Sequence, residues 1–281
     1  MPARVDAHAH FFRPGYAASL PANCRRIQPD EVTLYTALAQ QHGVQQVLAV
    51  GYEGEAWATG NNRYLMELAA SYARIRPVAF VDNLARLDVP ALEGWRQDGF
   101  VGLSLYLFAE QEINALVQVP DEVWAWLTRQ RWIVSVNSRG EHWVVWTSVL
   151  ERHPHLCLLV SHLGLPRAVA QVPDAATARH ELRSVCSLAR FSGVRVKLSG
   201  FYALTEPGYD YPHQAAWPYV EALLTDFGSL RLLWGSDFSP SLEWLSFPQT
   251  LGLFARMPFL DEVDRQRIEG ENLLTLLERV I

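Results

Sequence analysis

The chain has 281 residues, with 24 basic and 30 acidic side chains and a formal net charge of −6. This acidic balance argues against nucleic acid or an anionic membrane surface as the main partner, and no apolar run approaches the roughly 20 residues that cross a bilayer. Hydrophobic residues make up 49% of the sequence, enough for a large core. The three cysteines, Cys24, Cys157 and Cys186, are too scattered for a disulfide framework, so we expect a cytoplasmic protein.

Short apolar segments recur along the chain, and a more polar, helix-like stretch follows most of them. These segments are rich in Val, Ile, Leu and aromatic residues, as strands buried on both faces should be. In chain order, the predicted strands are Arg4–Ala9, Val44–Val50, Pro77–Asp82, Val101–Leu107, Trp132–Asn137, Leu156–His162, Val194–Ser199 and Leu232–Asp237.

Eight strands that alternate with helices predict one α/β domain over residues 1–281, a (β/α)8 TIM barrel. An open doubly wound sheet is the alternative, although no GxGxxG turn follows the first strand. Proline and acidic residues open two of the helices, as is typical of a helical first turn. The predicted helices include Pro29–Gln41, Asn62–Tyr72, Pro120–Arg131, Trp143–Arg152 and Tyr219–Asp226.

Polar residues at strand ends are the candidates for catalysis, because TIM-barrel active sites form at the C-terminal ends of the strands. His8 and His10 end the first strand, His162 ends the sixth and Asp237 ends the eighth. Alternation along a strand places both histidines of the pair on one face, together with Asp6. Satisfied core histidines or a helix N-cap could explain each residue alone. Four such residues at one rim favour an active site.

The same rule sorts the other polar residues. His153 and His155 precede the sixth strand and belong to the opposite rim, while His42, His180 and His213 occur where surface or capping roles are expected. Residues that end or follow strands two, four, five and seven could line a substrate pocket, although each alone could equally be a packing residue. These candidates are Tyr52, Tyr106, Asn137, Arg139, His142 and Tyr202.

Four motifs, in the order DAHAH, SHLGLP, VKLSGFY and RLLWGSDFSP, resemble the amidohydrolase-related family. Within that family they are most similar to the branch of lactonases that act on sugar lactones and on pyrone dicarboxylate. The similarity extends along nearly the whole chain, to Gly270-Glu271-Asn272. It implies a TIM-barrel lactone hydrolase in which Asp237 is the general base and His8, His10 and His162 surround the reacting group.

The metal site that the resemblance implies is incomplete in this chain. Relatives that hold zinc usually have a histidine at the end of strand five, where this sequence has Asn137. We therefore expect at most one divalent ion such as zinc, weakly held by His8, His10 and Asp237, or none. The single lysine, Lys197, lies on strand seven rather than on strand four, which argues against a two-metal site bridged by a carbamylated lysine. The sequence does not define its role.

The substrate side of the resemblance also differs. Pyrone-dicarboxylate lactonases carry substrate-binding arginines at three positions that are Ser104, Leu165 and Ala203 here. Because the arginine fork that clamps carboxylates is missing, we expect neutral sugar lactones to be better substrates than a dicarboxylate. Arg139 is the residue that could supply a relocated anchor.

Taken together, the sequence predicts a hydrolase that opens a lactone ring of a small molecule by attack of water. Histidine donors suffice for an activated ester and are poor for an amide, which favours a lactonase over an amidase. Two alternatives remain: a metal-dependent non-oxidative decarboxylase of the same superfamily, and a catalytically silent barrel that binds a small molecule. No nucleic-acid or membrane partner is expected, and a homodimer is left open.

Overall fold

Eight parallel strands form the centre of the molecule. The computed structural model describes residues 3–21 and 30–280. Each strand pairs in parallel with the next one along the chain, in the order β1 to β8. This arrangement confirms the predicted barrel and excludes the doubly wound sheet, in which the strand order reverses. The strands are β1 (Arg4–Ala9), β2 (Val44–Val50), β3 (Ile75–Phe80), β4 (Gly102–Leu107), β5 (Ile133–Ser138), β6 (Cys157–Val160), β7 (Val194–Leu198) and β8 (Leu232–Trp234).

The barrel closes through the segment that follows β8. The strand itself ends at Trp234, three residues before the end that the sequence predicts. Beyond it, Phe238 forms a parallel bridge with Ala9, and the Asp237 N–H donates to the His8 carbonyl at 2.8 Å. Asp237 has a φ of 53°, so it cannot continue an extended strand. The seam of the barrel therefore runs through residues predicted to be catalytic.

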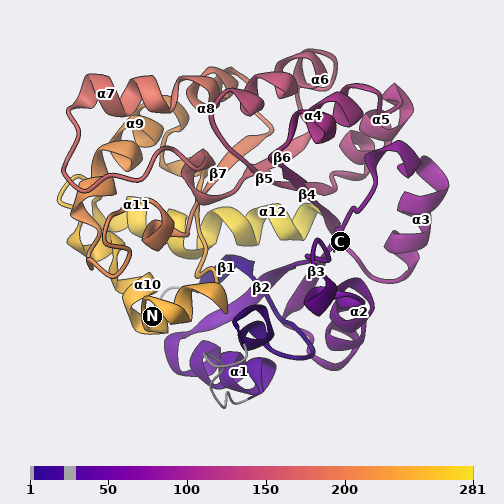
Figure 1. Cartoon of the computed structure of the whole chain (residues 1–281), viewed down its shortest axis with the longest axis horizontal. Coiled ribbons are helices and arrows are strands. Elements are labelled where there is room, and N and C mark those ends of the chain that lie inside the picture. The colour runs from indigo at the N-terminus through magenta and orange to yellow at the C-terminus, as the bar shows by residue number, and fades with distance from the viewer. Residues whose placement is uncertain (1–2, 22–29, 281) are drawn as a thin grey trace.

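Helices surround this ring of strands (Figure 1). Five of them correspond to the predicted helices, namely α1, α2, α5, α6 and α9, with ends that differ by a few residues. Pro29, the predicted start of the first helix, lies outside the described residues, as does Cys24. The helices are α1 (Glu31–His42), α2 (Asn61–Ser71), α3 (Val89–Gln97), α4 (Glu110–Val117), α5 (Asp121–Gln130), α6 (Trp146–Arg152), α7 (Ala175–Glu181), α8 (Arg183–Ser187), α9 (Trp217–Phe227), α10 (Phe247–Gly252), α11 (Glu262–Gln266) and α12 (Asn272–Val280).

The last helix, α12, covers the end of the barrel where the strands begin. In Figure 1 it crosses the centre of the ring in yellow. Its buried residues Leu273, Leu276 and Leu277 pack in one cluster with Val5 and Ile133 from the start of two strands. Within the described residues, this end of the barrel is thus filled with apolar side chains, and a polar site is expected at the opposite end.

A layer of buried polar residues lies above this apolar cluster. Ser104, Ser135, Ser161 and Lys197 are each at most 1% exposed and come from strands β4, β5 and β7 and from the residue after β6. Lys197 Nζ donates to Ser135 Oγ at 2.6 Å and lies 3.1 Å from His8 Nδ1. The interior therefore changes from apolar to polar along the barrel axis, toward the C-terminal ends of the strands.

The prediction that Asp6 shares a face with His8 is wrong. The carboxylate of Asp6 accepts a hydrogen bond from the hydroxyl of Tyr35 on α1, outside the barrel, at 2.9 Å. The pairing of β1 with β2 is irregular between Asp6 and Ala9, and this shift changes which side chains face inward. His8 therefore turns toward Lys197 in the interior while Asp6 points to the helix layer.

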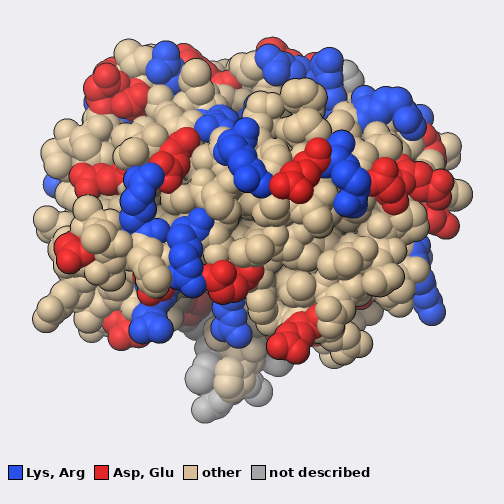
Figure 2. Space-filling view, turned by 90° about the horizontal axis from the view of Figure 1, so that it is seen from above, with Lys and Arg blue, Asp and Glu red and all other residues tan. Residues whose placement is uncertain are grey.

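Charged side chains of both signs are interspersed on the face shown in Figure 2, without a large area of one sign. Two examples of exposed ion pairs on the surface of the molecule are Arg190 with Glu151 at 2.9 Å and Arg152 with Asp121 at 2.8 Å. None of the helices within the described residues is long and apolar enough to cross a membrane.

Candidate active site

A cavity of about 1050 Å³ opens at the C-terminal ends of the strands. His10, His162 and Asp237 lie in its wall, although they come from the two ends and the middle of the sequence. Tyr52, Tyr106, Asn137 and Tyr202, predicted to bind substrate, also line it. His8 lies directly behind His10, with the two Nε2 atoms 3.0 Å apart. The structure thus brings eight of the ten predicted site residues to one place.

Arg139 and His142 do not line this cavity. Arg139 is exposed, and its guanidinium lies 5.8 Å from the ring centre of Phe108. His142 donates from Nδ1 to the Leu107 carbonyl at 3.2 Å. After β5 the chain enters a 3-10 helix, Gly140–Val145, which turns both side chains away from the barrel mouth. The predicted substrate anchor at Arg139 is therefore not available in this arrangement.

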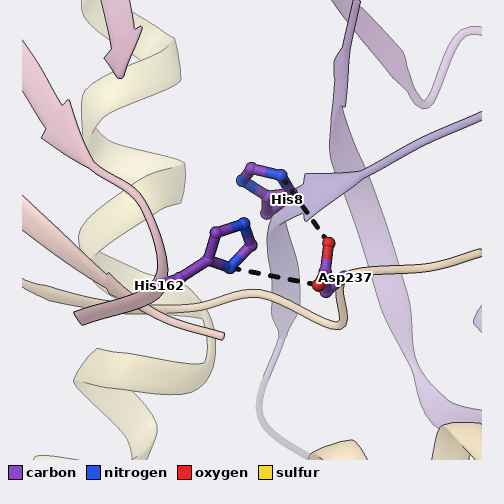
Figure 3. A group of neighbouring side chains, drawn as sticks. All are labelled: His8, His162 and Asp237. Carbon is purple, nitrogen blue, oxygen red and sulfur yellow. Dashed lines mark ion pairs between the residues drawn. The ribbon is translucent and has the colours of Figure 1, made fainter. Parts of the chain in front are cut away.

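Three potential ligand atoms converge at the inner end of the cavity. His8 Nε2 and His10 Nε2 lie 3.7 and 3.8 Å from Asp237 Oδ1, and 3.0 Å from each other. Figure 3 shows that His162 points at the same carboxylate, with its Nδ1 4.0 Å from Asp237 Oδ2. All four residues are at most 7% exposed. Asp237 thus stands between three imidazoles that are shielded from bulk water.

The hydrogen bonds define which ring nitrogens carry protons. His10 Nδ1 faces the Val50 carbonyl at 2.8 Å and must donate to it, so the Nε2 of neutral His10 is an acceptor. His8 Nε2 must therefore be the donor in the 3.0 Å contact between the two rings. This leaves His8 Nδ1 as the acceptor for Lys197 Nζ, at 3.1 Å. The contact with Lys197 thus favours the His8 tautomer that carries its proton on Nε2. The sequence alone did not predict this contact.

Burial controls the charges in this cluster. It lowers the pKa of His8 well below its usual value, lowers that of His10 to about 4 and also lowers that of His162. Burial likewise lowers the pKa of Lys197 to about 7. The three histidines are therefore neutral at pH 7, while the lysine titrates close to that pH.

The donor set fits one divalent ion. Ligands held at about 2.0–2.2 Å from a tetrahedral zinc ion lie roughly 3.3–3.6 Å apart. The three edges of the triangle between His8 Nε2, His10 Nε2 and Asp237 Oδ1 measure 3.0, 3.7 and 3.8 Å. The ammonium form of Lys197 opposes such an ion, because it repels a cation and favours the His8 tautomer whose Nε2 carries a proton.

The carboxylate of Asp237 is held by Tyr202 and does not act as a helix cap. The Tyr202 hydroxyl donates to Asp237 Oδ2 at 2.7 Å. Burial, followed by the charge of Asp237, raises the pKa of Tyr202 well above its usual value, so this hydroxyl remains a donor. The short helix after the strand, Pro240–Glu243, has Ser239 at its N-cap position. The N-cap interpretation of Asp237 is therefore excluded by its geometry.

Gly200 lets the segment after β7 approach His162 closely. Its φ is +67°, and a Cβ on it would lie 2.6 Å from His162 Nδ1. The preceding Ser199 places its hydroxyl oxygen 3.0 Å from the same nitrogen. His162 itself has a φ of 52°, a conformation that is uncommon for residues with a side chain and that clusters at functional sites. The loop after β6 thus holds this imidazole at the barrel mouth at some conformational cost.

Sequence reasoning missed several residues of the site. Asp6 accepts hydrogen bonds from the backbone N–H groups of His8 and Ser236, at 3.0 and 2.9 Å, and so ties β1 to the segment that carries Asp237. Phe12 and Trp57 line the cavity. The DAHAHFF motif contains Asp6 and Phe12, and the WGSD motif contains Ser236, whereas no sequence pattern marks Trp57.

The barrel and the cluster at its mouth define a hydrolase of the TIM-barrel class. The chain belongs to the amidohydrolase family, whose family model matches residues 5–278.

Two curated relatives are similar over most of their length. The L-fucono-1,5-lactonase of Burkholderia ambifaria is 29% identical over 252 residues, covering 85% of this chain and 81% of the relative. The L-fucono-1,5-lactonase of Burkholderia multivorans is 26% identical over 271 residues, covering 90% and 88%. Among solved structures, a zinc-bound amidohydrolase from Burkholderia multivorans superposes with a TM-score of 0.78 at 22% identity, covering 98% of this chain and 99% of the other.

Proposed function

We propose that the protein is a lactonase, which opens the ring of a small lactone by attack of water on its carbonyl carbon. The observation that supports this most strongly is the position of Asp237. Its carboxylate lies in the wall of the cavity, with His8 Nε2 and His10 Nε2 within 3.8 Å of Oδ1. Both curated relatives named above are lactonases that act on a sugar lactone.

In this proposal Asp237 moves the protons. Its carboxylate takes a proton from water as the water oxygen bonds to the lactone carbonyl carbon. The carbon–oxygen bond of the ring then breaks, and the same carboxyl group returns the proton to the leaving alkoxide. Tyr202 donates to Oδ2, so Oδ1 is the oxygen that faces the water. The products are a hydroxy acid and the regenerated aspartate.

The neutral imidazoles hold the water and the carbonyl oxygen. His162 lines the cavity next to Asp237, and a donor fixed in a water-excluded site stabilises the developing oxyanion much more than a donor in water does. His8 and His10 form the opposite side of the carboxylate, where their Nε2 atoms meet.

We include a weak divalent-metal site in the proposal. His8, His10 and Asp237 would hold the ion, which when bound supplies Lewis acidity and lowers the pKa of its water. The zinc in the neighbouring structure from Burkholderia multivorans is consistent with such a site. Asn137 and Lys197 argue for weak binding, because the former replaces a stronger ligand and the latter can carry a positive charge. The cytoplasmic location and a homodimer stay predictions.

A panel of neutral and anionic lactones, assayed with a pH indicator, tests the proposed function. We expect acid release from at least one neutral sugar lactone, with and without a chelator, and a rate at least about a hundredfold lower after Asp237 is changed to Asn. Decarboxylation of a hydroxybenzoate in the presence of zinc, without hydrolysis of any lactone, would replace the proposal with the decarboxylase alternative. Tight lactone binding without turnover would favour the silent barrel.

A further inference from the structure

The cavity is larger than the proposed chemistry requires. Pockets of roughly 300–1,000 Å³ enclose drug-sized ligands, and this cavity measures about 1050 Å³. A single six-membered lactone at Asp237 and His162 would leave most of that space to water. The lining continues outward past these residues to Trp57, Asp82 and Gln111, in the outer part of the cavity.

A continuous series of ring contacts leads from the candidate catalytic cluster into the outer part. The ring centres of His10 and Phe12 are 5.8 Å apart, and those of Phe12 and Trp57 are 4.6 Å apart. Trp57 in turn contacts Tyr52 at 6.3 Å, and Tyr52 contacts Tyr106 at 4.8 Å. All five residues line the cavity. Trp57 is thus the second ring from His10 along an aromatic wall.

Trp57 is held in place by a carboxylate. Its Nε1 donates to Glu55 Oε2 at 2.9 Å, and the Tyr52 hydroxyl donates to Glu55 Oε1 at 3.2 Å. Tyr16 packs edge-on against the same indole at 5.9 Å between ring centres. An indole fixed by its N–H offers a rigid aromatic face, which attracts the positively polarised C–H groups of a sugar ring as well as planar rings.

The charges around the outer part select against an acidic ligand. Glu55, Asp82 and Glu112 line the cavity, and Arg86 is the one arginine or lysine among the described residues of its lining. Carboxylate oxygens accept strong hydrogen bonds from hydroxyl groups and repel carboxylates. An aromatic face beside acidic acceptors suits an uncharged ring with many hydroxyls better than a bare aryl group.

We propose that the outer cavity is a sugar subsite, and that the substrate is a lactone carrying an uncharged glycosyl unit. The lactone ring lies at Asp237 and the second ring stacks on Trp57. This inference rests on the proposed lactonase function, and it deepens that function by naming the substrate class.

Matched lactones test the proposal. Glucono-1,5-lactone is compared with cellobiono-1,5-lactone and maltobiono-1,5-lactone, which add a glucosyl unit to the same oxygen. We expect kcat/KM to be at least about tenfold higher for one of the glucosyl lactones, a difference of about 1.4 kcal/mol. Trp57→Ala should bring the ratio close to one, and Trp57→Phe should retain part of it. Tyr209→Ala, which removes an aromatic side chain 69% exposed and outside the cavity, should leave the ratio unchanged.

Other results would overturn the inference. Equal kcat/KM for all three lactones would show that the outer cavity contributes nothing, while the lactonase function would stand. A preference for a phenyl-substituted valerolactone over valerolactone, without a preference for glucosyl lactones, would assign the subsite to aryl groups instead. If no lactone is hydrolysed, calorimetry of the binding of cellobiose, maltose and glucose tests the sugar subsite separately from the lactonase function. Tighter binding of a disaccharide that is lost in Trp57→Ala supports the subsite, and equal binding refutes it.

Discussion

Asp237 is the residue on which the proposed chemistry depends. A general base typically contributes about 10²–10⁴-fold to the rate, and Asn in its place keeps the shape while removing the proton acceptor. Asn also tolerates the left-handed conformation with φ 53° that Asp237 adopts. We expect Asp237→Asn to lower kcat by at least about a hundredfold with little change in melting temperature.

Steady-state kinetics on the best lactone and a thermal melt check this expectation. Asp98→Asn, a change of the same kind at the exposed C-terminal end of α3, serves as the control for nonspecific effects. A folded Asp237→Asn enzyme with near wild-type turnover would remove Asp237 from the mechanism.

Lys197 makes a second prediction at the residue scale. Its ammonium lies 3.1 Å from His8 Nδ1, where it repels a divalent ion and favours a protonated His8 Nε2. Lys197→Met keeps the length of the side chain and removes both effects. We expect more zinc per chain in the variant than in the wild type after purification at pH 7, measured by elemental analysis. Ser135→Ala removes the other partner of Lys197 but keeps the charge, and it should leave the metal content unchanged.

Residue-scale reasoning from the sequence succeeded where strand ends define position. His8, His10, His162 and Asp237 each end or follow a strand, so barrel geometry alone brings them to one rim. It failed for Arg139, because the conformation of the loop after β5 decides where that side chain points. The partner of Lys197 also could not be predicted, since it depends on the inward turn of His8 at an irregular strand pairing.

At the scale of elements, the order of strands and helices followed from the sequence, and their ends did not. β3 begins at Ile75, two residues before the predicted Pro77. Ile75 and Arg76 pair with Val47 and Leu48 of β2, and the Arg76 Nε donates to Gln46 at 3.0 Å; no local pattern reveals these long-range contacts. β6 ends at Val160 because His162 takes up a left-handed conformation. The ends of strands thus depend on how the barrel closes and on the site it carries.

The segment between β7 and α9 carries a prediction about pH. His213, which the sequence assigned to the surface or to a cap, is fully buried and pairs with Thr205 through Nδ1 at 2.7 Å. Burial lowers its pKa from 6.5 to about 4. Between these values the unfolded chain binds the proton more readily than the folded one. The contribution of His213 to stability is therefore complete above pH 6.5 and is lost as the pH falls toward 4.

His213→Asn suits the positive φ of this position and removes the titrating group. We expect the variant to lose less free energy of unfolding than the wild type between pH 7 and pH 5, measured by urea unfolding. His180→Asn, at an exposed position of α7, should behave as the wild type does. Parallel pH profiles for the wild type and His213→Asn would refute the assignment.

At the scale of the whole molecule, charge bears on the choice of substrate. The net charge is −6, and the cavity is lined by Glu55, Asp82, Glu112 and Asp237 against Arg86 alone of the described arginines and lysine. Such a field slows the approach of anions, and salt screens it. Neutral lactones should therefore be hydrolysed better than pyrone dicarboxylate. Added salt should raise kcat/KM for the dicarboxylate severalfold and leave that for neutral lactones unchanged.

Initial rates at several salt concentrations measure both parts of this prediction. Efficient hydrolysis of the dicarboxylate with neutral lactones inert would contradict it and would point to Arg86 as a carboxylate anchor. In that case Arg86→Gln should abolish the activity, whereas Arg190→Gln, at an exposed surface ion pair, should retain it.

The seam of the barrel links catalysis to the kinetics of folding. The Asp237 N–H donates to the His8 carbonyl, and the Asp6 carboxylate accepts from the Ser236 N–H, so the candidate catalytic cluster forms only when the two ends of the sheet meet. The Asp6–Ser236 hydrogen bond joins residues 230 positions apart. Contacts of such long sequence separation are slow to form. During refolding, enzyme activity therefore reports the joining of the first and last strands. Its recovery should coincide with or follow the burial of the tryptophans in the helical layer, and never precede it.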